Sequence, residues 1–266
     1  MKQPMVMGAV VLALGVVPVA AQERRSADEW CRESGWNDER ARACDVREYT
    51  VPAGAIRIDA GPNGGVRVIG GPRADTLVRA RVVTTASTQA DADALSRQVQ
   101  VATAGGTVKA TGPDTSGVRN RGWHVSYEVW VPEKTDVTAS TRNGGIALHN
   151  VAGTLAFDAV NGGVSLSRVS GDVKGTTVNG GVSVELAGAR WEGAGLDART
   201  TNGGVKVKLP DGYACQLAVS TVNGGVRTDF PLTVQGRVDR RLDVALNGGG
   251  APIRITTTNG GVHLTR

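Results

Sequence analysis

The stretch "FDAVNGGVSLSRV", from Phe157 to Val169, contains an Asn-Gly-Gly triplet that returns along the chain. Near-copies followed by Val or Ile begin at Asn143, Asn161, Asn179, Asn202, Asn223 and Asn259. Two further triplets begin at Asn63 and Asn247. From Asn143 onward, with Asn247 included, successive triplets lie 18, 18, 23, 21, 24 and 12 residues apart. A repeat of this length is typical of a solenoid, in which short segments of chain stack on one another.

The residues around each triplet keep their size and polarity from one repeat to the next. Six positions before the Asn stand Val137, Leu155, Val173, Leu196, Leu217 and Ile253. Three positions after it stand Ile146, Val164, Val182, Val205, Val226 and Val262. Such columns are expected when equivalent residues stack in parallel. The sequence therefore predicts an all-β protein in which residues 133–266 form a parallel β-solenoid, with Asn-Gly-Gly corners and rungs of roughly 18–24 residues.

Asn-Gly between alternating apolar residues is also a strong signal for a β-hairpin, so a meander of hairpins is the alternative fold. The asparagine itself favours the coil. Equivalent residues of stacked rungs lie ~4.8 Å apart, which lets side-chain amides hydrogen-bond as a ladder. We expect this corner ladder at Asn143, Asn161, Asn179, Asn202, Asn223 and Asn259. A second ladder is expected at Thr141, Thr177, Thr200, Thr221 and Thr257, each two positions before its Asn.

The first residues, "MKQPMVMGAVVLALGVVPVAAQ", combine Lys2, an apolar run and small residues before Gln22. This pattern is typical of a secretory signal peptide, which we assign to residues 1–21. We therefore expect an exported protein, periplasmic or secreted to the cell surface, with no transmembrane segment after cleavage.

Two sections separate the expected signal peptide from the coil. Residues 22–46 are charged and contain two cysteines, and "NDERARACDVRE" within them suggests a short helix capped by Asn37. Residues 47–132 alternate apolar and polar residues as half-buried strands do, around a helix-forming stretch, "STQADADALSRQV". We expect a small mixed β-sheet with one short helix there, which caps the first rung of the coil.

The chain has three cysteines, Cys31, Cys44 and Cys215. Disulfides persist in an oxidising compartment, and the first two cysteines lie in a segment too polar to form its own core. We favour a Cys31–Cys44 disulfide and a buried thiol at Cys215. A Cys44–Cys215 pairing is the alternative, because connectivity cannot be read from spacing.

Composition and motifs argue against several functional classes. The formal net charge of +5 is spread along the chain and gives no reason to expect nucleic acid as a partner. His124, His149 and His263 lack a second ligand at metal spacing. The Gly-rich turns are not followed by the Lys and Ser/Thr of a nucleotide loop, and no nucleophile elbow is present. We expect no cofactor, no metal and no catalytic residues.

Candidate ligand-binding residues lie in two excursions from the repeat, at 187–195 and 231–245. In the first, Trp191 beside Arg190 could stack on a sugar ring or could fold back over the edge of the coil. In the second, Arg237, Arg240 and Arg241 could contact phosphates or acidic glycans, or could form an ordinary solvated face.

The segments "VSYEVWVPEKTDVTASTRNGGIALHNVAG", "VSGDVKGTTVNGGVSVEL" and "TTNGGVKVKLPDGY" resemble the bacterial DUF4097 family of proposed adhesins, whose relatives include GIN-type domains of autotransporter heads. The resemblance covers roughly residues 50–266 and is strongest after Val125. Family members more often have Ser-Gly-Asp at the corner, so the uniform Asn-Gly-Gly is a variant. The resemblance implies a β-solenoid at the cell envelope with a role in adhesion, and it brings no catalytic residues.

We therefore interpret the chain as an exported, non-catalytic, adhesin-like binding or structural protein. Its expected partner is a glycan, an envelope component or another protein. An open edge at the last rung predicts either that the 231–245 excursion folds over that end, or that a second copy or a partner strand meets it there. The alternatives are a polysaccharide-active β-helix enzyme and an envelope-stress protein that acts through a partner.

Overall fold

The computed structural model describes residues 25–32, 40–231 and 239–266. The expected signal peptide at 1–21, the Asn37 cap and Arg237 lie outside these ranges. The described residues form two ten-stranded sheets, together with the helices α1 (Ala27–Arg32) and α2 (Gln89–Gln98) and the 3-10 turn Ala104–Gly106. The prediction of an all-β fold is confirmed.

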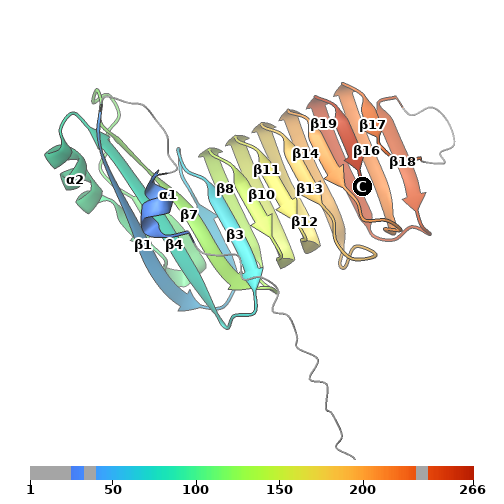
Figure 1. Ribbon diagram of the computed structural model, residues 1–266, viewed down its shortest axis with the longest axis horizontal. Coiled ribbons are helices and arrows are strands. Elements are labelled where there is room, and N and C mark those ends of the chain that lie inside the picture. Colours follow the sequence, from blue (N-terminus) through green and yellow to red (C-terminus); the bar gives the residue numbers. More distant parts are fainter. Residues whose placement is uncertain (1–24, 33–39, 232–238) are drawn as a thin grey trace, which may run out of the picture.

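The two sheets lie face to face, and their strands follow one another along the long axis of the molecule (Figure 1). Sheet A has the order β1 (Ala41–Pro52), β4 (Asp75–Ala86), β7 (Gly122–Pro132), β3 (Val66–Gly71), β9 (Ile146–His149), β11 (Val164–Ser167), β13 (Val182–Glu185), β15 (Val205–Lys208), β20 (Val262–Thr265) and β17 (Val226–Thr228). Sheet B has the order β18 (Arg241–Leu246), β16 (Cys215–Asn223), β19 (Pro252–Asn259), β14 (Gly195–Asn202), β12 (Ser170–Asn179), β10 (Ala152–Asn161), β8 (Val137–Asn143), β2 (Ile56–Asp59), β6 (Thr107–Thr111) and β5 (Gln100–Ala102).

Each repeat contributes one strand to each sheet. In the unit that contains "FDAVNGGVSLSRV", β10 in sheet B leads through Asn161-Gly162-Gly163 into β11 in sheet A. We call such a unit a strand pair. Neighbouring strand pairs run parallel, with Val164 opposite both Ile146 and Val182. The hairpin alternative is wrong for these strands, because hairpins would pair them antiparallel.

Side-chain alternation places the core between the sheets. In β11, Val164 and Leu166 are buried whereas Ser165 is exposed, as the two-residue period of a strand requires. Many small β-branched and leucine side chains therefore fill the interior, and the largest fully buried side chains include only two aromatics, Tyr127 and Tyr213.

In every triplet except that of Asn247, the first glycine is required by close approach of the backbones. A Cβ atom on Gly162 would lie 1.9 Å from the carbonyl oxygen of Gly144, and one on Gly180 would lie 2.1 Å from that of Gly162. The second glycine is less crowded, since a Cβ atom on Gly163 would lie 3.4 Å from the carbonyl oxygen of Gly181. The strict requirement for glycine therefore falls on the first of the two.

The section before residue 133 does not form a separate small sheet, which corrects the sequence prediction. Its strands β2 and β6 extend sheet B, and β3 and β7 extend sheet A. Asn63 forms a parallel bridge with Asn143, so this triplet is the first member of the series and no outlier. The predicted helix at "STQADADALSRQV" is present as α2, capped by the side chain of Thr88.

The helix expected in "NDERARACDVRE" is wrong. Residues 41–52 form β1, which pairs antiparallel with β4 along its whole length, from Ala41 opposite Ala86 to Pro52 opposite Asp75. Strand β1 thus crosses the expected boundary between residues 46 and 47. Twelve positions of backbone pairing outweigh the local preference of a charged segment for helix, which is weak.

The order of the last strand pairs differs from the order of the chain. The pair β19–β20 lies between β14–β15 and β16–β17, so both of its strands have neighbours on each side (Figure 1). Strand β18 then pairs antiparallel with β16 at the end of sheet B. The C-terminal strand pair therefore has no open edge, which corrects that expectation. Strand β18, which begins within the 231–245 excursion, covers the end of sheet B instead.

Candidate binding groove on sheet A

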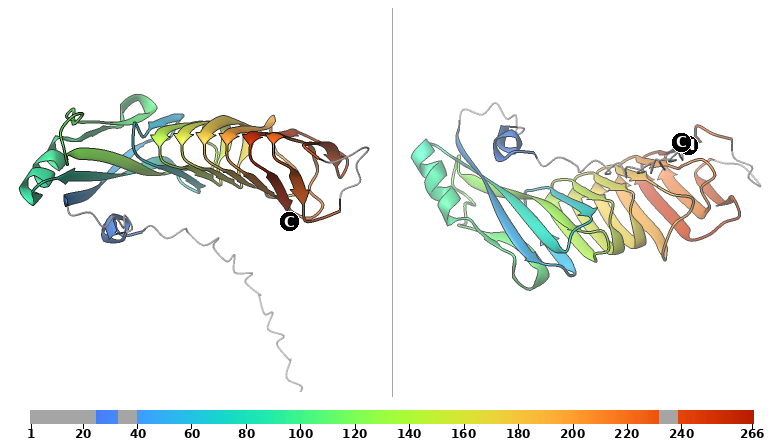
Figure 2. Two further views of the ribbon diagram at one scale, coloured as in Figure 1. Left: turned by 90° about the horizontal axis from the view of Figure 1, so that it is seen from above. Right: turned by 60° about the horizontal axis from the view of Figure 1, so that its bottom comes forward.

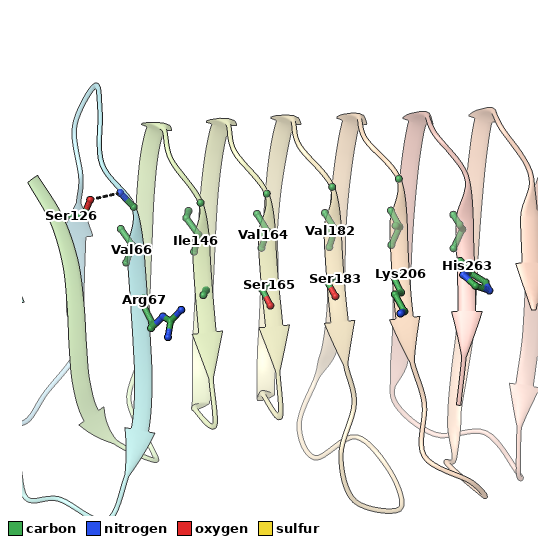
Figure 3. Close-up of a pocket in the computed structure, with 18 of the residues that line it drawn as sticks. Val66, Arg67, Ser126, Ile146, Val164, Ser165, Val182, Ser183, Lys206 and His263 are labelled. Carbon is green, nitrogen blue, oxygen red and sulfur yellow. Dashed lines mark hydrogen bonds between the residues drawn. The ribbon is translucent and has the colours of Figure 1, made fainter. Parts of the chain in front are cut away.

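A long groove crosses the outer face of sheet A. It has a volume of about 1390 Å³ and is lined by residues of β4, β7, β3, β9, β11, β13, β15, β20 and β17, together with Arg25 and Trp30. Figure 3 shows the strands side by side with the side chains that line it. The groove therefore runs across the repeats rather than along any one strand.

The repeat sequence determines the floor of the groove. From β3 to β20 in the order of the sheet, the first residue of each strand, such as Val164 or Val182, is buried, and the second points outward. Small outward residues occupy the middle strands and larger basic ones the two ends: Arg67, Ala147, Ser165, Ser183, Lys206, His263 and Arg227, in the order of the sheet. Beside these small residues, toward the corners, the groove is lined by the exposed glycines Gly145, Gly163, Gly181 and Gly204.

The groove carries a positive charge. The side chains of Arg67, Lys206 and Arg227 are exposed and form no hydrogen bond or ion pair with the residues that the structure describes. The two acidic residues of the groove have partners: Asp229 lies 2.7 Å from Nε2 of His263, and Glu128 pairs with Arg25 and lies 3.6 Å from Arg79. Arg67, Lys206 and Arg227 are therefore available to pair with an anionic ligand.

One end of the groove is formed by α1. The views in Figure 2 show this helix against one face of the strands and not between the sheets. Trp30 is buried, with the guanidinium carbons of Arg25, Arg79 and Arg81 lying 5.5, 5.5 and 5.2 Å from its ring centroid. Such stacking of cations on an aromatic face is attractive and stabilises the contact.

A Cys31–Cys44 disulfide connects α1 covalently to β1, which confirms the favoured pairing. Cys215 is a buried free thiol, and burial raises its pKa to about 11. The role of α1 as a wall of the groove was not predicted. The signal available in the sequence was Trp30, a large apolar residue beside a cysteine in an otherwise charged segment.

The asparagines of the corners form a continuous series of side-chain hydrogen bonds. Each Nδ2 donates to the Oδ1 of the neighbouring asparagine over 2.7–3.0 Å, in the spatial order Asn63, Asn143, Asn161, Asn179, Asn202, Asn259 and Asn223. Asn247 is different: its amide donates to the carbonyl oxygen of Tyr213 over 2.9 Å. Amides thus connect seven successive strand pairs along one edge of the molecule.

The threonines do not bond to one another, so the expected second ladder is wrong. Each hydroxyl donates instead to the carbonyl oxygen of a first glycine in the neighbouring strand pair, as Thr177 does to Gly162 over 2.8 Å and Thr200 to Gly180 over 2.7 Å. The carbonyl is an obligatory acceptor at a turn where the strand ladder is interrupted. The threonine hydroxyls therefore satisfy these backbone carbonyl oxygens instead of bonding to one another.

Those candidate ligand residues of the two excursions that the structure describes lie outside the groove. Trp191 is buried, and its Nε1 donates to the carbonyl oxygen of Gly171 over 3.0 Å, so its ring is not available to stack on a sugar. Arg190 is exposed and lies 4.0 Å from Glu192. Arg240 and Arg241 are exposed near the end of sheet B, and Arg237 lies outside the described residues.

Within the part of the chain that the structure describes, no group of three or more His, Cys, Asp or Glu could hold a metal ion. The three histidines lie on β7, β9 and β20. Burial, with the charges of Arg81 and Arg42, lowers the pKa of His124 to about 4.

None of the described helices is long and apolar enough to cross a membrane.

Comparison with known proteins supports the resemblance stated above. Residues 136–265 match the family model described as Toastrack DUF4097, which confirms the resemblance over the strand pairs that follow residue 135. The match is narrower than the expected 50–266. The unmatched part contains the long antiparallel strands β1 and β4 and α2, which interrupt the repeat.

Two solved structures are similar over most of the chain. A proposed cell adhesion protein from Clostridium sporogenes has a TM-score of 0.47 and 10% identity, covering 84% of this chain and 99% of that one. A proposed adhesin from Bacteroides fragilis has a TM-score of 0.37 and 14% identity, covering 84% of this chain and 97% of that one. No curated protein matches the chain.

Proposed function

We propose that this protein is an exported, non-catalytic, adhesin-like binding protein of the cell envelope. The observation that carries the proposal is the groove of about 1390 Å³, which is lined by residues of nine strands of sheet A. Its exposed cations Arg67, Lys206 and Arg227 lie on β3, β15 and β17 and are therefore spread along the groove, which suits contact with an extended ligand. A cleft with a few placed polar groups is the usual form of a binding site.

The scaffold under the groove is, in this proposal, a β-solenoid whose rungs are the strand pairs of residues 133–266. Parallel pairing in both sheets and the asparagine ladder support this assignment. Stacked rungs contact only their neighbours, which makes a rigid rod with one extended face. Such a face suits the capture of an extended ligand.

Export is supported by the Cys31–Cys44 disulfide, because disulfides persist outside the reducing cytosol. The family match is consistent with the same location, since the resemblance is to proposed envelope adhesins. The leader at residues 1–21 remains a prediction, as does the periplasm or cell surface as the destination.

The test is a binding screen of the purified protein on a glycan array, together with pull-down of solubilised envelope fractions. We expect retention of at least one glycan or envelope component and competition by excess of that component. Substitution of groove cations should weaken the retention. Absence of binding in both formats, with a folded protein, would contradict the proposal.

A further inference from the structure

The groove contains a row of backbone N–H groups with no acceptor among the residues that the structure describes. In the triplets of the asparagine ladder, the second glycine directly precedes a strand of sheet A, and it is exposed at the middle strands. The N–H groups of Gly145, Gly163, Gly181 and Gly204 donate no hydrogen bond to any described residue, whereas their carbonyl oxygens accept from the strand beside them, as that of Gly163 does from Ile146. Free donors therefore recur once per strand along the groove.

One position shows what such a donor binds. The N–H of Gly65 donates to the hydroxyl Oγ of Ser126 over 3.2 Å (Figure 3). Ser126 lies opposite Gly65 in β7, where Val66 is opposite Tyr127. In the next strands the residue at the place of Ser126 is itself a glycine, because Ile146 is opposite Val66 and Val164 is opposite Ile146. A ligand oxygen could therefore occupy the place that the serine hydroxyl fills at Gly65.

Donors and cations together specify a ligand class. Strand spacing is ~4.8 Å, so Arg67 on β3 and Lys206 on β15 lie roughly 19 Å apart, and Arg227 on β17 extends the span to roughly 29 Å. A ligand that reaches all three must be long, rich in hydrogen-bond acceptors and anionic. The floor between them consists of Ala147, Ser165 and Ser183, which offer no aromatic platform for stacked bases.

We propose that the groove binds a linear acidic polysaccharide, whose hydroxyl and ring oxygens accept the glycine N–H groups and whose carboxylates pair with Arg67, Lys206 and Arg227. This inference rests on the proposed function and names its ligand class. The binding should weaken with added salt, because the cations are exposed and therefore screened.

The first experiment measures binding of the purified protein to polygalacturonate, with uncharged dextran as the comparison. The double variant R67Q/K206Q should weaken the affinity about fivefold, since each exposed charge pair contributes little by itself. Its matched control is R57Q/R254Q, which removes the same charge from exposed positions of β2 and β19 in sheet B. Equal losses in the two variants, or equal binding of dextran, would overturn the proposal.

The second experiment tests the donors. Gly163→Ser should place a hydroxyl next to the N–H of Gly181, as Ser126 does for Gly65, and should weaken polygalacturonate binding several-fold. Gly163→Ala adds a comparable Cβ atom, 3.4 Å from the nearest oxygen, without a competing acceptor, and should weaken it less. Thermal melting establishes that both variants are folded. Binding unchanged in Gly163→Ser would overturn the role of the donors.

The outcomes separate this inference from the function on which it rests. Retention of an envelope component without any binding of polygalacturonate would overturn the acidic-polysaccharide proposal and leave the binding function standing. Absence of both would overturn both. If Gly163→Ser fails to fold, the paired arginine and lysine variants still decide the question.

Discussion

Asn259 donates its side-chain amide to Oδ1 of Asn202 over 2.7 Å, although 57 positions separate them in sequence. Asn223, which precedes Asn259 in the chain, donates to Asn259 from the other side over 2.8 Å. The amide ladder therefore follows the spatial order of the strand pairs, not their order in the chain. Identical triplets let strand pairs exchange places without changing the contacts at the corner.

The ladder predicts unequal effects of removing its members. Asn179→Ala loses a bond to Asn161 and one from Asn202, whereas Asn63→Ala loses only the bond from Asn143. We expect Asn179→Ala to lower the free energy of unfolding by on the order of 1–2 kcal/mol, and Asn63→Ala by about half as much. Chemical denaturation measures both, and equal losses would contradict a contribution from the ladder.

The two glycines of a triplet should differ sharply in tolerance. Gly162→Ala would bring a Cβ atom within 1.9 Å of the carbonyl oxygen of Gly144, whereas Gly163→Ala brings it only to within 3.4 Å of that of Gly181. We expect the first variant to lose more than about 2 kcal/mol of stability, as severe overpacking does, and the second to remain near the parent protein. A comparison of melting temperatures tests this, and similar values for the two variants would refute it.

Reduction of the Cys31–Cys44 disulfide should release α1 and leave the sheets folded. The bond closes a loop of 13 residues, and a loop of that size stabilises by roughly 3 kcal/mol in the chain-entropy model. Hydrogen exchange should rise over residues 27–32 on reduction, whereas residues 137–228 keep their protection. Cys215→Ala serves as the control and should behave in the same way. A collapse of protection in both regions would show that the disulfide supports the whole fold.

Acid should destabilise the protein through His124. Its pKa falls from 6.5 to about 4 in the folded state because burial disfavours the charged imidazole. Between these values the unfolded chain binds a proton that the folded chain does not, so stability is present above pH 6.5 and declines toward pH 4. The decline amounts to at most about 3 kcal/mol at 1.36 kcal/mol per pKa unit. His124→Gln should flatten this part of a stability–pH curve, and an unchanged slope would assign it to other groups.

Trp191 should matter for stability and not for ligand binding. Trp191→Phe keeps a buried ring but loses the hydrogen bond to Gly171, for which we expect a loss of about 1 kcal/mol. Glycan retention by this variant should equal that of the parent protein. Loss of retention in a folded Trp191→Phe variant would bring back the sugar-stacking interpretation.

The fold of the repeat region was predictable because the spacing of its apolar residues from each Asn determines the register of the strands. Column residues such as Val164 and Val182 recur at fixed distances from the Asn, and each takes the same buried place in the structure. The insertion of β19–β20 was not predictable, since Asn259 fits next to Asn202 as well as next to Asn223. Local chemistry that is the same in every copy carries no information about the order of the copies.

The groove could be only partly predicted. The outward places of Arg67 and Lys206 follow from strand alternation once the register is known. Arg67 and Lys206 lie on the same face because β3 and β15 belong to the same sheet. The sequence of residues 47–132 did not predict that β3 joins this sheet. Trp30 and α1 reach the groove through tertiary contacts with Arg79 and Arg81, and no periodic signal marks such contacts.

The insertion of β19–β20 has a consequence for biosynthesis. A chain that emerges from residue 1 onward makes β16 and β17 before the strands that separate them from β14 and β15. The two strand pairs can take their native places only after residues 252–265 have been made, so this part of the fold closes after translation of that segment. Until then the edges of β14 and β15 lack their native neighbours, and unpaired strand edges are sites of misassembly. Timely synthesis of the last strand pair is thus a condition for a correctly ordered stack.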